Sequence, residues 1–286
     1  MAIGSGRRLP PLAWLSHFQK HMYYGWNMLS RLKEFAKAEM QRRGRCIGIY
    51  PLAQYFMQFD IDCVLDVGAN IGQTGTELRS LGYRGHIASF EPQSKECEIL
   101  RSIAAKDHCW SVFQFGLGSE SGLKTLNISG KGPSSSFLDL SDEALSSNPD
   151  LKYVDTEQVR THRLDDVFEQ VTKGHKRVYL KIDTQGFESE VLEGASGVID
   201  RVLGVQLEIS LIPQYDGEVV AEEMISRVRS LGFTPFWFLP GHRNFLTQQL
   251  YQLDMIAFRQ SKIAMNIGVD PNALPDVKNS IRTRSV

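Results

Sequence analysis

The chain has 286 residues, of which 42% are hydrophobic and 23% are charged, and these values are typical of soluble globular proteins. They exclude a disordered, collagen-like or disulfide-stapled chain. The net charge is −1, but the first 45 residues hold nine Lys or Arg against two Glu, and the rest holds 23 Lys or Arg against 31 Asp or Glu. Phosphates repel such an acidic body, so we do not expect nucleic acid as a substrate.

Residues 1–45 are predicted to form a basic, amphipathic helical extension. Apolar residues recur at steps of three or four from Leu15 to Ala36, which is typical of one helical face. Two interpretations stay open: a helix that contacts anionic lipid or a partner protein, and an extension that caps the rest of the chain. We favour the second, because Glu34 and Glu39 dilute the basic face.

The cysteines and the hydropathy pattern bear on the location of the protein. The four cysteines have no C-x-x-C spacing, and the sequence contains neither a run of about 18 apolar residues nor a signal-peptide segment. We therefore expect a cytoplasmic protein, with any membrane contact peripheral and made by the basic segment.

Short apolar runs alternate with helical stretches after residue 45. The pattern predicts strands at Cys63–Val67, His86–Phe90 and Ser111–Phe115, with helices over 73–81 and Ser94–Ala105 between them. This β-α-β-α-β order indicates an α/β fold with a parallel sheet and right-handed crossovers.

Residues 119–160 interrupt this rhythm with glycine, proline and serine. We predict a β-hairpin at Leu123–Ile128 followed by a mobile loop. An insert of this kind is either a lid over the substrate or a solvated surface loop.

The sheet resumes after the insert. Strands are predicted at Val178–Asp183, Val202–Ile209, Thr234–Leu239 and Gln252–Phe258, with helices at Glu188–Glu193 and Glu218–Leu231. The last two strands leave no room for a helix, so they should form an antiparallel hairpin at one edge of the sheet. One domain is therefore expected over residues 46–259, followed by a tail at 260–286.

A glycine-rich turn in the segment VLDVGANIG, Val64–Gly72, marks a ligand site. Glycines let a ligand approach the backbone, and the following helix N-terminus offers free N–H groups. Glu91 lies nineteen residues beyond Gly72, at the end of the second strand. A carboxylate there can accept both ribose hydroxyls of an adenosine group.

Asp66 distinguishes between two classes of adenosine-containing ligand, dinucleotides and S-adenosylmethionine. A carboxylate at roughly 5 Å would repel a pyrophosphate by several kcal/mol at an effective dielectric of about 20. S-adenosylmethionine instead carries an ammonium and a sulfonium cation, so Asp66 favours it. Asn70 stands where the dinucleotide pattern G-x-G-x-x-G has its second glycine, which also counts against a nicotinamide-dependent oxidoreductase.

Seven blocks, in order VLDVGANIGQT, SFEP, FGLGSESG, SSS, RLDD, LKIDTQGFESEVLEGA and LEIS, resemble the FkbM family of S-adenosylmethionine-dependent methyltransferases over about residues 60–260. The resemblance implies the class I, Rossmann-like methyltransferase fold with seven strands. It also implies an O-methyltransferase that acts on a hydroxyl of a sugar, glycan, glycolipid or natural product. The family usually has Asp-x-Glu-Gly where this chain has Gln at position 185.

The resemblance also implies roles for residues around the cofactor. Glu91 would bind the ribose, and Phe115–Leu117, including Gly116 and Leu117, would lie by the adenine. The methionine moiety would be held by Asp66, Gly68, Asn70 and Gly72.

Three charged residues are candidates for the chemistry. Asp183 and Glu208 end neighbouring strands, and ligands of open α/β sheets bind at that edge. An acceptor hydroxyl must lose its proton, so Asp183 is the first candidate for the base or for orienting the acceptor. Lys181 shares its face of the strand and could pair with Asp183 or stabilise an alkoxide. His162 is a weaker candidate base.

Three alternatives stay open. Asp183 and Glu208 could bind Mg²⁺, but the sequence identifies no third oxygen ligand, and we predict no metal site. Ser134–Ser136 could bind substrate or close a lid. The chain could also be a non-catalytic methyltransferase-like protein that binds S-adenosylmethionine, although Asp66 and Glu91 argue for an intact cofactor site.

Overall fold

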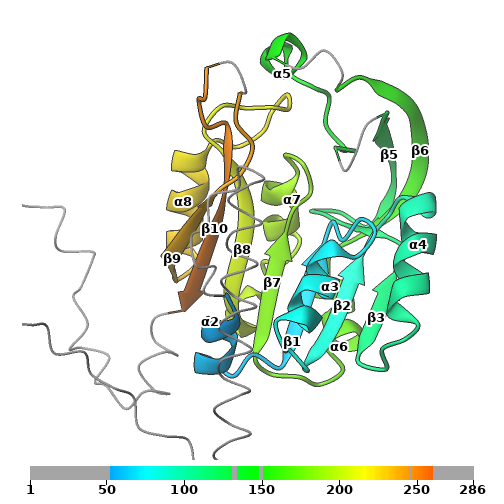
Figure 1. Ribbon diagram of the computed structural model, residues 1–286, viewed down its shortest axis with the longest axis vertical. Helices are drawn as coiled ribbons and strands as arrows, with labels where there is room; N and C mark the ends of the chain where they lie inside the picture. Colours follow the sequence, from blue (N-terminus) through cyan, green and yellow to red (C-terminus); the bar gives the residue numbers. More distant parts are fainter. Residues whose placement is uncertain (1–51, 131–133, 148–150, 245–246, 260–286) are drawn as a thin grey trace, which may run out of the picture. The chain divides into compact units, whose positions relative to one another are not determined.

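The computed structural model describes residues 52–130, 134–147, 151–244 and 247–259. Their main element is a seven-stranded sheet with the order β3-β2-β1-β7-β8-β10-β9 (Figure 1). Pairing is parallel except that β10 runs antiparallel to both β8 and β9. The predicted mostly parallel sheet with an antiparallel hairpin at one edge is therefore confirmed. The strands are β1 (Cys63–Val67), β2 (His86–Phe90), β3 (Trp110–Phe113), β7 (Val178–Ile182), β8 (Val202–Ser210), β9 (Phe233–Pro240) and β10 (Gln252–Arg259).

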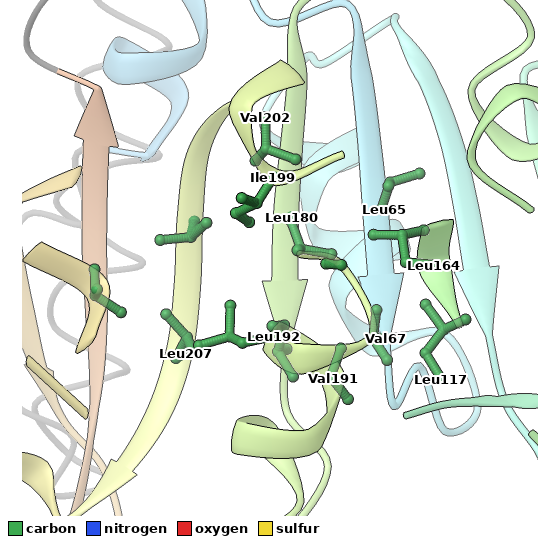
Figure 2. Packing of buried hydrophobic residues seen from close by; sticks show 14 of the residues in the cluster. Leu65, Val67, Leu117, Leu164, Leu180, Val191, Leu192, Ile199, Val202 and Leu207 are labelled. Atoms are coloured by element: carbon green, nitrogen blue, oxygen red, sulfur yellow. The ribbon is translucent and has the colours of Figure 1, made fainter. Parts of the chain in front are cut away.

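Helices cover both faces of this sheet, and β1, β2 and β7 are accordingly buried along their whole length. One face carries the main apolar core. Figure 2 shows Leu65, Leu180 and Leu207, from three neighbouring strands, gathered there with Val191 and Leu192. The helices that contribute to this core are α6 (Leu164–Thr172), α7 (Glu188–Glu193) and α8 (Ala221–Ser230).

Three other helices belong to the opposite side and to the edge of the sheet. Phe56 of α2 (Leu52–Gln58) packs edge-on against Tyr179 of β7, with ring centroids 4.8 Å apart. In α3 (Gln73–Ser80), Gly75 lies against the ring of Trp110. The helix α4 (Ser94–Ala104) packs against β3.

A second, three-stranded sheet with the order β4-β6-β5 corrects our prediction for the insert. Its strands are β4 (Gly116–Leu117), β5 (Gly122–Ser129) and β6 (Tyr153–His162). The predicted hairpin at Leu123–Ile128 is wrong, since this segment is one strand, and it pairs antiparallel with the distant strand β6. Between β5 and β6 lies the short helix α5 (Asp142–Ser147). In Figure 1, β5 and β6 extend beyond the main sheet on the side toward which β1, β2 and β7 point.

Several elements were not predicted, among them β6, α2 and α6. The strand β6 is polar and largely exposed, with Val159 and Thr161 as its buried residues, so it lacks the apolar alternation that marks a strand. The helix α2 is only seven residues long, and α6 begins at Leu164, directly after β6 and the single residue Arg163. In α6, Leu164, Phe168 and Val171 do recur at helical spacing, but the helix is only nine residues long.

The second sheet contacts the helices that flank the main sheet at two places. Backbone and side chain of Ser94, at the start of α4, both donate to the Glu157 carboxylate of β6. At the end of α7, the carbonyl oxygen of Gly118 approaches Gly194 so closely that a Cβ there would lie 1.9 Å from it. The backbone N–H of Asp165, in α6, also donates to Gly194 O, at 3.0 Å.

The predicted helical extension at residues 1–45 and the tail at 260–286 lie outside the described residues, as do their proposed contacts. In the part of the chain that the structure describes, no helix has both the length and the apolar character needed to span a membrane.

We expect Gly194→Ala to lower the free energy of unfolding by about 2–3 kcal/mol, because the added methyl group forces two backbone segments apart. Urea unfolding followed by circular dichroism measures this loss. Gly122→Ala is the matched control, since its Cβ would meet nothing within 4 Å. Equal stability of the two variants would show that the close approach at Gly194 is not needed.

Candidate active site

A cavity of about 320 Å³ opens at the carboxyl ends of β1, β2, β7 and β8. Residues that follow these strands line one side of it, and Gly116, Leu117, Leu126, Ser135 and Phe137 from the second sheet and its connection line the other. The insert therefore supplies one wall of the cavity. Eight predicted site residues line it: Gly68, Asn70, Glu91, Gly116, Leu117, Lys181, Asp183 and Glu208.

The glycine loop after β1 has a backbone that ordinary residues rarely adopt. Gly68, Asn70 and Gly72 all have positive φ, at 76°, 48° and 93°, and asparagine tolerates this region better than most residues. At Gly68, a Cβ would lie 1.8 Å from the carbonyl oxygen of Asp183. Glycine is therefore required there, because the chain leaving β7 crosses the loop at van der Waals contact. Gly72 precedes α3 and does not line the cavity.

Glu91 lies directly after β2 and is 7% exposed. Its Oε2 accepts the backbone N–H of Asn70 at 2.7 Å, and its Oε1 accepts that of Gln93 at 2.8 Å. Burial raises the pKa of Glu91 to about 7, although both hydrogen bonds favour the carboxylate. The carboxylate thus joins the glycine loop to the segment after β2, and both its oxygens keep a free lone pair for a ligand.

Strand register places a polar row beneath the cavity. Asp66 of β1 stands opposite both Ser89 of β2 and Lys181 of β7. Asp66 is fully buried and does not line the cavity. Its Oδ2 accepts the Ser89 hydroxyl at 3.2 Å, and its Oδ1 lies 3.5 Å from Lys181 Nζ. The predicted contact of Asp66 with a methionine moiety would thus be made through its neighbours.

Lys181 is the centre of charge at this site. Its Nζ also lies 3.3 Å from Oδ2 of Asp183. Burial lowers the pKa of Lys181, but the carboxylates of Asp183, Asp66 and Asp254 more than offset this and raise it. Burial raises the pKa of Asp66, against the lowering effects of Lys181 and Ser89. Lys181 is therefore a buried cation shared by two carboxylates.

Asp183 and Glu208 converge on one amide group. Gln185 Nε2 donates to Asp183 Oδ1 and to Glu208 Oε2, both at 3.0 Å. The side chain of Asp183 is 35% exposed, so it is open to a ligand in the cavity. Burial, followed by the nearby charge of Asp183, raises the pKa of Glu208 well above its ordinary value. Asp183 and Glu208 are thus both partly exposed carboxylates that line the cavity, and burial is the strongest influence on the pKa of Glu208.

The serine run contacts both ends of the cavity. Ser135 Oγ donates to Gln93 Oε1 at 3.0 Å, next to Glu91, and Ser136 Oγ donates to the carbonyl of Gln185 at 2.6 Å. His162 stands apart from this group. Its ring packs edge-on against Phe115, at 4.6 Å between centroids, and neither residue lines the cavity.

Sequence reasoning missed the polar residues that hold the carboxylates. Gln185 was noted as a departure from the family pattern, yet no signal revealed the partners Tyr215, Gln93 and Gln252, because they lie in loops or on another strand. Within the described ranges, no group of three or more His, Cys, Asp or Glu side chains is arranged to hold a metal ion.

Comparison with known proteins gives a match over the same region. Residues 66–235, more than half of the chain, match the family described as the methyltransferase FkbM domain. No curated protein sequence matches the chain significantly.

Solved structures with a similar fold are distant in sequence. Magnesium protoporphyrin IX methyltransferase from Synechocystis PCC 6803 with bound SAM is 10% identical, with 73% of this chain and 76% of that chain covered and a TM-score of 0.41. Fibrillarin from Aeropyrum pernix with S-adenosyl-L-methionine is 11% identical, with 68% and 66% covered and a TM-score of 0.39. A putative S-adenosylmethionine-dependent methyltransferase from Listeria monocytogenes is 8% identical, with 71% and 92% covered and a TM-score of 0.40.

We expect Lys181→Met to lower the free energy of unfolding by about 3–5 kcal/mol at pH 8, because it leaves the buried Asp66 without a counter-charge. Without Lys181, the folded-state pKa of Asp66 rises further above its unfolded value. The penalty is then largest above the folded-state pKa and shrinks as the pH falls through it. Urea unfolding at pH 8 and pH 5 measures both effects.

The control for this variant is Lys106→Met, at an exposed position after α4. Its stability should match the wild type at both pH values. A loss for Lys181→Met that stayed constant with pH would contradict the assigned role of the lysine as a counter-charge.

Proposed function

This chain belongs to the FkbM methyltransferase family, and from that premise we propose that it transfers the methyl group of S-adenosylmethionine to an acceptor hydroxyl. The proposed acceptor is a sugar, glycan, glycolipid or related natural product. One observation carries the proposal: Glu91, suited to a ribose, and the accessible Asp183 open on the same cavity. S-adenosylmethionine supplies a methyl group on a sulfonium centre, which is electrophilic.

The residues around the glycine loop suit this cofactor. Glu91 has free lone pairs for the ribose hydroxyls, and Gly68 and Asn70 leave room for the methionine moiety at the cavity wall. The start of α3, with Gln73 and Thr74 in the cavity lining, offers N–H donors for a carboxylate. Gly116 and Leu117 would bound the adenine.

Asp183 is proposed to orient the acceptor hydroxyl and to accept its proton. Lys181 and Gln185 each contact one of its oxygens, so the carboxylate is held in place before the acceptor binds. A fixed base near the reacting oxygen contributes through orientation and proton transfer. In this proposal Glu208 does not take up the proton itself, but helps to fix the Gln185 amide that holds Asp183.

The charge at the acceptor end supports a neutral acceptor. Asp183 and Glu208 line this end, and Lys181 already pairs with two carboxylates. Acceptors that carry phosphate groups would be repelled there. We therefore propose neutral hydroxyl compounds rather than nucleic acids.

The cofactor assignment is tested by calorimetric titration with S-adenosylmethionine. We expect micromolar binding to the wild type, and Glu91→Ala should lose about 1–3 kcal/mol of binding free energy with its ribose hydrogen bonds. Glu98→Ala, exposed on α4, serves as the control and should bind like the wild type. NAD should not bind. Equal affinity of Glu91→Ala and Glu98→Ala would remove the ribose assignment.

The catalytic assignment is tested by following label from tritiated S-adenosylmethionine into a panel of neutral sugars, glycans and glycolipids. Once an acceptor is labelled, Asp183→Asn should react about 10²–10⁴-fold more slowly, because it cannot take up the proton. Asp155→Asn, exposed on β6, should react like the wild type. An unchanged rate for Asp183→Asn would sink the assignment. Cofactor binding without transfer to any acceptor would favour the non-catalytic alternative.

A further inference from the structure

Gln185 lies at the point where the two carboxylates of the acceptor end meet. Its backbone has a positive φ of 56°, which is uncommon outside glycine. The hydroxyl of Ser136 donates to its carbonyl oxygen at 2.6 Å. This turn directs the Gln185 side chain between Asp183 and Glu208, with 3.0 Å from Nε2 to an oxygen of each.

The other contacts of this amide fix which way it points. Tyr215 donates its hydroxyl to Gln185 Oε1 at 2.8 Å. An amide has two N–H donors, and both are used on the two carboxylates. Glu208 Oε2 also accepts the side-chain amide of Gln252 at 3.1 Å. Each polar atom of the Gln185 amide thus has a partner of the opposite hydrogen-bonding type.

The charged surroundings of this amide are mainly acidic. Lys181 approaches it from β7, through Asp183. The other titratable groups that face this cluster come from the ends of β7 and β8, from β10, from α7 and from the loop after β8: Asp183, Glu208, Asp254, Glu188, Glu218 and Tyr215. A neutral donor at position 185 therefore adds hydrogen bonds without adding another negative charge.

A comparison with a glutamate at position 185 shows what the amide contributes. A carboxylate here would lie about 3 Å from two others and would require a shared proton or a cation between them. The amide of Gln185 avoids both requirements, because it supplies two N–H groups at that place.

We propose that Gln185 is a positioning residue. Its neutral amide holds the carboxylates of Asp183 and Glu208 side by side. A carboxylate at position 185 could do this only with a shared proton or a divalent cation. The function assigned to this positioning, presentation of Asp183 to an acceptor hydroxyl, rests on the proposed methyl transfer. The hydrogen-bonded arrangement itself does not depend on methyl transfer, so an experiment can overturn either the arrangement or the proposed function alone.

An exchange of amide and carboxylate tests the arrangement. We compare the full-length wild type, Gln185→Glu and the double variant Gln185→Glu/Glu208→Gln by thermal unfolding at pH 8. The single variant brings three carboxylates together and should lower Tm by about 5–10 °C. The double variant restores one amide between two carboxylates and should return to within about 3 °C of the wild type. A residue that only fills space would show no such recovery.

A second measurement repeats the unfolding in millimolar MnCl₂. Three carboxylates suit a hard divalent cation, so Mn²⁺ should raise the Tm of Gln185→Glu and leave that of the wild type unchanged. The matched control is Gln158→Glu, which adds the same charge at an exposed amide of β6. Its Tm should equal that of the wild type, both without and with MnCl₂.

Several outcomes would overturn the inference. These are a Tm of Gln185→Glu equal to that of the wild type, a double variant no more stable than the single one, or a wild type that Mn²⁺ stabilises as much as Gln185→Glu. Should Gln185→Glu fail to fold, a folded double variant supports the inference and an unfolded one overturns it. Titration of the wild type with S-adenosylmethionine reports on the proposed function alone, since it involves none of these variants.

Discussion

The positive charge of Lys181 connects the buried sheet to the open end of the cavity. Its Nζ lies 3.5 Å from Asp66 and 3.3 Å from Asp183. At an effective dielectric of about 20, an ion pair at such a distance gains about 5 kcal/mol of Coulomb energy, and desolvation costs several kcal/mol for each buried ion. The net free energy of burying the pair is therefore small, whereas burial of either charge without the other would be strongly destabilising. Since Asp183 shares the same cation, its position is tied to the core.

The second sheet gives the site at this edge of the main sheet a second wall. Parallel strands bring Glu91 and Asp183 to one edge, but an edge alone is open to water. The insert adds a wall through Leu126 and Phe137, and the serine run joins both ends of the cavity, through Gln93 and Gln185. A cavity that is partly shielded from water strengthens the electrostatic contacts inside it. The insert is therefore part of the site and not an appended surface loop.

The elements that could be predicted are those whose burial requires a recognisable pattern of apolar residues in the sequence. The runs at Cys63–Val67 and His86–Phe90 are buried on both faces, and their predicted bounds agree with β1 and β2. The strand β6 is exposed and pairs with a distant segment, so neither apolar alternation nor a turn signal marks it. At the site, strand ends were predictable because their place follows from topology. The partners of Gln185 were not, because side-chain hydrogen bonds such as that from Tyr215 depend on loop geometry.

Neutral donors, rather than cations, satisfy most contacts of the carboxylates at the cavity. Glu91 accepts two backbone N–H groups, and Glu208 accepts the amides of Gln185 and Gln252. Such donors satisfy the oxygens but leave the site with a negative potential. Under the proposed function, this potential attracts the sulfonium and ammonium charges of S-adenosylmethionine. Methyl transfer removes the sulfonium charge, so the same field holds the product less strongly than the cofactor. Under that proposal, the charge pattern that attracts the cofactor would also favour release of the product.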